Sequence, residues 1–195
     1  NFDELSADLI GKLSTLQIKG LTTDQVSALT TTEAATLSAA QTKALTTAQV
    51  VAMSSGQVSA LTTDQLKGLT TNAVKAIEVG DITALNSAQM NALSTSQIAA
   101  LTTSQVSLLG SQQIADLATT RLTALSTSQL NAITSSQAAA LTTDQMAALT
   151  TSNAAGLSST VLQALSSSQV AKLTSDLVKA LGTSQIQVLG SDQIA

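Results

Sequence analysis

A large aliphatic residue recurs at every eighth position of this chain, from residue 5 to residue 189, without an insertion. The residue is leucine throughout, apart from Met53, Ile77 and Ile133. The sixth position of the octad is also apolar, with Thr42 as its polar exception. The consensus octad reads L-[ST]-[ST]-x-Q-[VIL]-x-A. A short fixed repeat that never slips predicts an array in which each repeat packs on its neighbours.

The period of eight excludes one long straight helix. Eight residues at 3.6 residues per turn advance by about 800°, so an apolar stripe would drift by about 80° per octad. Coiled coils need repeats of seven or eleven residues. The chain must therefore change direction within each octad.

The polar positions of the octad indicate where a helix begins. The second position is Ser or Thr in 18 of 24 octads, and the fifth is Gln in 16 of 24. Ser or Thr followed three residues later by Gln is a capping box, and apolar residues at octad positions 1 and 6 then form a hydrophobic staple. The clearest predicted helix starts are Leu21, Thr22, Gln25 and Val26; Leu61, Thr62 and Gln65; Leu101, Thr102 and Gln105; and Leu141, Thr142 and Gln145.

The charged residues favour the same phase. A helix is stabilised by acidic residues in its first turn and basic residues in its last. Six of the nine Asp residues stand at octad position 4, and all seven Lys residues stand at position 7 or 8. A β-solenoid of eight-residue segments, which is the alternative fold, predicts no such polarity.

One octad cannot fold alone. Ordering eight residues costs on the order of 8–16 kcal/mol, whereas burying one Leu and one Val returns roughly 3–6 kcal/mol. Packing between repeats must supply the difference. We therefore predict an all-α solenoid of helices that are about six residues long.

Departures from the consensus recur every forty residues. At octad position 5 they include Glu33, Ala73 and Asn153, and the octads that follow carry Asp81 and Arg121 there. We predict one continuous array over 1–195, with super-repeats at 21–60, 61–100, 101–140 and 141–180 and partial units at 1–20 and 181–195. Forty residues are either a duplicated genetic unit or one five-octad coil of the solenoid.

The composition offers few side chains suited to catalysis or metal binding. The chain has no His and no Cys, so we expect no enzyme activity, cofactor or metal centre. Its net charge of −4 disfavours nucleic-acid binding, and no apolar run has the ~20 residues of a membrane span. Glu78 and Asp81 form the densest acidic spot, which we interpret as a degenerate octad rather than a cation site. The Gln column is assigned to capping rather than to reading a ligand.

The phrases LTTAQV at 45–50, LSTSQI at 93–98 and LTTSQV at 101–106 carry a family resemblance. The chain is similar to the Ser/Thr/Ala/Gln/Leu-rich repeat regions of very large bacterial secreted or cell-surface proteins of the adhesin or filament kind. The resemblance implies an extracellular structural element.

Two functions are expected. The first is a stalk, fibre, filament or surface-layer element that forms a homo-oligomer, assembles end to end or continues a longer array. The alternative is a binding module that presents a solenoid surface to a glycan, a partner protein or ice.

Overall fold

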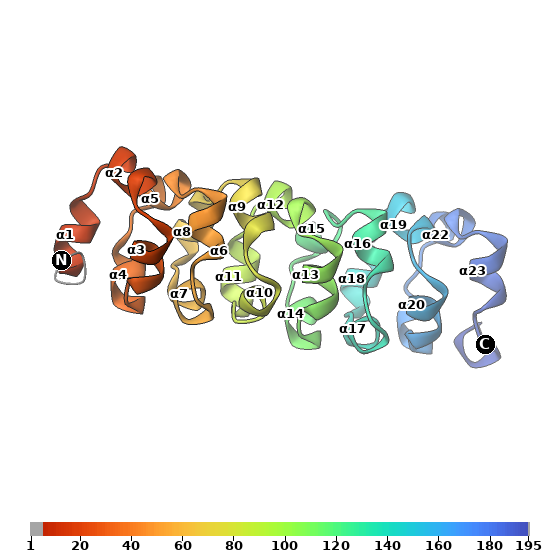
Figure 1. The fold of residues 1–195 in the computed structure, drawn as a ribbon. Coiled ribbons are helices and arrows are strands. Elements are labelled where there is room, and N and C mark those ends of the chain that lie inside the picture. The colour runs from red at the N-terminus through yellow and green to blue at the C-terminus, as the bar shows by residue number, and fades with distance from the viewer. Residues whose placement is uncertain (1–5, 195) are drawn as a thin grey trace. The chain divides into compact units, whose positions relative to one another are not determined.

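The computed structural model describes residues 6–194, and over this range the protein is built from short helices with no strand. Figure 1 shows coiled segments of one or two turns joined by brief links. The predicted all-α repeat fold is confirmed, and the alternative β-solenoid is wrong for these residues. Leu5, the first member of the apolar column, lies outside the described residues.

The helices belong to two compact units, residues 1–100 and 101–195. The first unit contains α1 (Ala7–Lys12), α2 (Thr15–Gly20), α3 (Thr23–Ala28), α4 (Thr31–Thr36), α5 (Ala39–Ala44), α6 (Thr47–Val51), α7 (Ser55–Ala60), α8 (Thr63–Gly68), α9 (Thr71–Ala76), α10 (Val79–Ile82), α11 (Ser87–Ala92) and α12 (Thr95–Ala100). The second contains α13 (Thr103–Leu108), α14 (Ser111–Ala115), α15 (Thr119–Leu122), α16 (Thr127–Asn131), α17 (Ser135–Ala140), α18 (Thr143–Ala148), α19 (Thr151–Ala155), α20 (Ser159–Ala164), α21 (Ser167–Val170), α22 (Ser175–Ala180), α23 (Thr183–Gln187) and α24 (Ser191–Ile194). There is one helix for each octad.

Within each unit, every helix packs on the third helix along the chain. In the first unit α1 contacts α4, α4 contacts α7, and α7 contacts α10. In the second unit α13 contacts α16, and α16 contacts α19. One coil is therefore three octads, or 24 residues, and each unit holds three parallel stacks of helices. The interpretation in which forty residues make one coil is wrong for both units.

Many of the helices, α3 among them, end where two successive residues take an extended conformation. Leu29, after α3, has φ −58° and ψ 135°, and Thr30, before α4, has φ −69° and ψ 161°. The Leu29 amide donates to the Val26 carbonyl at 3.2 Å and closes the last turn. No described residue has a positive φ. The chain turns every eight residues without the left-handed glycine that ends many helices.

The core is formed by the two apolar octad positions. Leu61 and Leu66 in one octad, and Leu93 and Ile98 in another, are buried. Thr42, the polar residue at position 6, is also buried, and its hydroxyl donates to the Ser38 and Ala39 carbonyls. The small residues at position 8 allow close approach. A Cβ added to Gly68 in α8 would lie 2.5 Å from the Ala39 carbonyl oxygen at the start of α5.

Candidate functional site

The structure places a capping box at each of the four clearest helix starts. The Thr22 amide donates to Gln25 Oε1 at 2.9 Å, and the Gln25 amide donates to Thr22 Oγ1 at 3.1 Å. The same two bonds join Thr62 with Gln65, Thr102 with Gln105 and Thr142 with Gln145. The apolar partners Leu61, Leu101 and Leu141 are buried, as is Val26, whereas Leu21 is half-buried.

The glutamine side chain also bonds to the preceding coil. Gln57, which is only 1% exposed, donates from Nε2 to the Val26 carbonyl at 2.8 Å and to the Leu29 carbonyl at 2.6 Å. These acceptors stand 31 and 28 residues earlier, in the last turn of α3 and on the leucine that links α3 to α4, the helix on which α7 packs. We call this set of bonds the glutamine ladder. Further full rungs are made by Gln41, Gln49, Gln65, Gln97, Gln137, Gln145, Gln169, Gln185 and Gln193.

The ladder donates hydrogen bonds to carbonyls that a helix would otherwise leave unpaired. The last carbonyls of any helix lack an intrahelical donor, and leaving them buried and unpaired costs about 1–3 kcal/mol each. One amide group serves two coils here, because Oε1 caps the start of its own helix while Nε2 caps the end of a helix in the preceding coil. These glutamines therefore have two roles: the predicted capping of their own helix, and a bond to the preceding coil that was not predicted from the sequence.

Capping alone does not explain why octad position 5 is Gln rather than Glu. This preference is the sequence signal that could have revealed the ladder. Glu33 shows that a carboxylate caps equally well, because the Thr30 amide donates to Glu33 Oε2 at 2.7 Å. Yet Glu occupies octad position 5 once, against sixteen Gln residues. A carboxylate has no N–H to donate to the coil beneath.

The ladder has gaps at octads that depart from the consensus. Buried apolar residues replace Gln at Ala73, Val161 and Leu177. Asn153 keeps a weaker rung, with Nδ2 at 3.3 Å from the Leu125 carbonyl oxygen and 3.5 Å from that of Thr123. Asp81 is buried at the same position and donates nothing.

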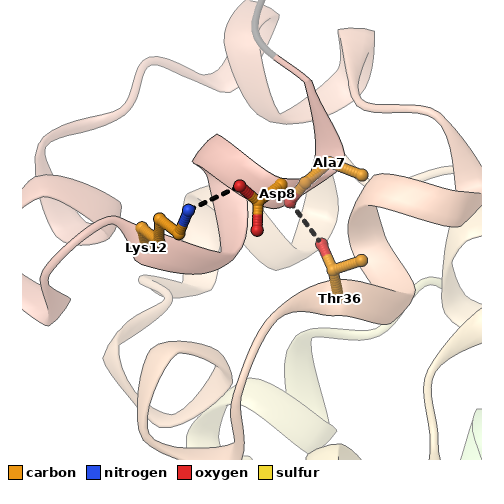
Figure 2. Close-up of polar contacts among 4 residues, drawn as sticks. All are labelled: Ala7, Asp8, Lys12 and Thr36. Atoms are coloured by element: carbon orange, nitrogen blue, oxygen red, sulfur yellow. Dashed lines mark hydrogen bonds and ion pairs between the residues drawn. The ribbon is translucent and has the colours of Figure 1, made fainter.

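The ion pairs lie on the surface and join the first and last turns of single helices. Asp8 pairs with Lys12 in α1 (Figure 2), Asp64 with Lys67 at 3.1 Å, and Asp176 with Lys179 at 3.7 Å. Figure 2 also shows the Thr36 hydroxyl of α4 donating to the Ala7 carbonyl of α1 at 3.2 Å. Lys172 departs from the expected pattern, because α21 ends at Val170.

The described residues contain no group of three or more side chains suited to holding a metal ion. Glu78 is the N-cap of α10, and its side chain makes no capping bond. Arg121 has a neighbour in Thr120, whose hydroxyl oxygen lies 3.2 Å from Nη1.

The second unit carries a polar groove of about 580 Å³. Among its lining residues, Thr127, Ser128, Asn131, Ser159 and Ser184 make no side-chain hydrogen bond within the described part of the chain. Hydroxyls and an amide that face one groove offer both donors and acceptors, without charge, to a neutral polar ligand.

None of the described helices is long and apolar enough to cross a membrane. No curated protein matches the chain. The ALTTAQ repeat matches it in four overlapping segments, residues 39–71, 74–111, 91–120 and 114–151, which together cover more than half of its length. The chain therefore belongs to the ALTTAQ repeat family.

Proposed function

We propose that this chain is a structural repeat element of an extracellular stalk, fibre or surface layer. The glutamine ladder carries the proposal, because it joins coil to coil through buried bonds between side chain and backbone. Gln145, for example, is 2% exposed and bonds to the Ile114 and Leu117 carbonyls at 2.8 and 2.7 Å. Stacked coils of this kind keep the parts of a protein at their two ends at a fixed distance from each other.

The ladder also supports association in the direction of stacking. Gln17 and Gln25 cap their own helices, and their Nε2 atoms donate to no carbonyl in the described residues. At the other side of the ladder, no donor in the described residues reaches the Leu173 carbonyl, which could accept from such a side chain. A second copy, or further coils of a longer array, would complete these rungs as the coils within each unit do.

Self-assembly is tested by light scattering and electron microscopy over a range of protein concentrations. The unmodified chain should form rods that lengthen as its concentration rises. The double variant Gln17→Glu, Gln25→Glu keeps both capping bonds, as Glu33 does, but loses both donors, so its rods should stay short. If the chain is monomeric at every concentration, self-assembly is contradicted, and the stalk role is still consistent with the result.

The extracellular location has its own test. Antibody labelling of intact source cells should mark their surface or the filaments that they release. Labelling that requires broken cells would contradict an extracellular role.

The polar groove favours a second function, the binding of a neutral glycan. A glycan array should give hits that Ser128→Lys and Asn131→Leu weaken by about tenfold or more, since each removes hydrogen bonds inside the groove. Ser152→Lys, which changes an exposed serine that does not line the groove, is the matched control. An array without hits would remove this function.

A further inference from the structure

Asp81 replaces glutamine within the ladder of the first unit. It lies in α10 at the octad position that Gln57 holds in α7, on which α10 packs. Its side chain is buried, with 7% of the residue exposed. Glu33, the acidic residue at the same position in α4, is not buried. Asp81 is therefore a carboxylate placed where the fold elsewhere places an amide donor.

No hydrogen bond or ion pair reaches the Asp81 carboxylate within residues 6–194. Its oxygen atoms also keep some contact with solvent, because no enclosed side-chain oxygen in that range lacks a partner. A small species can therefore reach the carboxylate from outside.

The register places Asp81 against backbone carbonyls of the preceding coil. Gln57 bonds to the carbonyls 31 and 28 residues earlier, and for Asp81 the residues at these separations are Val50 and Met53. Asn153, which has the same side-chain length as Asp, comes within 3.3 Å of the carbonyl 28 residues earlier. In the described residues no donor reaches the Met53 carbonyl. The gap in the ladder is thus surrounded by acceptors.

The Val50 carbonyl accepts from the Met53 amide at 3.2 Å, but the Asp81 carboxylate has no donor in the described part of the chain, and a buried carboxylate is costly unless it is paired or binds a metal. Carboxylate and carbonyl oxygens are the ligands that Ca²⁺ prefers, in variable number and flexible geometry. Glu78 supplies a second carboxylate three residues before Asp81, and its side chain is not engaged in capping. We propose that this gap binds one Ca²⁺ ion through the Asp81 carboxylate, the Met53 and Val50 carbonyls, Glu78 and water.

The test is thermal unfolding of the whole chain in EDTA and in rising CaCl₂ at constant ionic strength. Few protein ligands predict weak binding, with a dissociation constant of about 10⁻⁴–10⁻³ M. At tenfold excess over that value the stabilisation is about 1.4 kcal/mol, so the midpoint should rise by about 3–6 °C. Isothermal titration calorimetry with CaCl₂ should give one site per chain.

Two variants separate the site from the general effect of calcium on an acidic protein. Asp81→Gln restores the missing rung and should unfold at a higher temperature than the unmodified chain in EDTA, with no response to CaCl₂. Glu33→Gln removes one negative charge at the same octad position and should keep the full response.

A midpoint that CaCl₂ does not move, or that KCl moves equally, would overturn the proposal. So would a calcium response that survives in Asp81→Gln. If that variant does not fold, the stoichiometry from calorimetry and the loss of binding in Glu78→Gln decide the question.

Discussion

A single glutamine side chain defines both the start of one helix and its attachment to the coil beneath. Replacing Gln57 by Ala removes the cap acceptor and leaves the buried Leu29 carbonyl without a donor, since Gln57 Nε2 is its partner at 2.6 Å. The cap contributes about 0.5–1 kcal/mol, and the unpaired carbonyl adds about 1–3 kcal/mol. We expect Gln57→Ala to lower the free energy of unfolding by about 1.5–4 kcal/mol in urea titrations.

Gln17→Ala is the matched control, because Gln17 makes the same capping bonds without a rung. It should cost only about 0.5–1 kcal/mol. Equal losses in the two variants would mean that the ladder contributes nothing to stability.

Capping could be predicted at the residue scale because its partners are three residues apart in the sequence. The ladder could not, because its partners are 28 and 31 residues apart and one of them is always a backbone atom. A backbone carbonyl leaves no trace in the choice of residue at its own position. Asp81 is interpreted from the sequence as part of a degenerate octad for the same reason, since its burial follows from the packing of α10 on α7.

The helices are too short to be stable alone, so their contacts decide which small residues are required. α8 approaches α5 closely at Gly68, where a Cβ would meet the Ala39 carbonyl oxygen at 2.5 Å. Gly20 ends α2 at the same octad position, yet a Cβ there would meet nothing within 4 Å.

Gly68→Ala should therefore lower the thermal midpoint, because backbone must move to admit the methyl group. Gly20→Ala should raise the free energy of unfolding by about 0.4–1 kcal/mol, because alanine loses less conformational freedom on folding. Differential scanning calorimetry of both variants checks the pair. A similar gain in both would show that α5 and α8 are not in close contact.

Helix starts were predictable, but helix lengths were less so. The described helices have four to six residues, and α10 and α15 in the irregular octads have four. Both lack a Ser or Thr cap, having Glu78 and Ala118 at that position. Lys172 falls beyond its helix because α21 also stops after four residues.

At the scale of the whole molecule, the number of octads per coil has no signature in the sequence. Each octad has the same caps and apolar positions whichever neighbour it packs on. Forty residues are not a whole number of 24-residue coils, so equivalent positions of successive super-repeats fall in different stacks. Glu33 lies in the stack of α1 and α4, whereas Ala73 lies in that of α6 and α9. The super-repeats, and one continuous array over 1–195, stay predictions from the sequence.

The three-octad coil predicts which deletions the fold accepts. Removing residues 29–52 deletes one coil and joins Ala28 to Met53 in octad phase. Removing residues 29–48 joins Ala28 to Gln49 and leaves residues 49–52 as a half octad that lacks the leucine position. The first variant should keep its helix content per residue and one cooperative transition, as nearest-neighbour stacking requires. The second should lose helix content and unfold at a lower temperature, as circular dichroism would measure. Equal helix content and equal unfolding temperatures in the two variants would argue against a coil of three octads.

Every rung of the ladder runs in one direction along the chain. A glutamine always donates to carbonyls that precede it by 28 to 31 residues, as Gln49 does to Leu21 and Ile18. A coil therefore completes its rungs using only residues that the ribosome has already added. The array can fold progressively during synthesis or export, with each new coil docking on a finished one and no coil waiting for a partner still to be made.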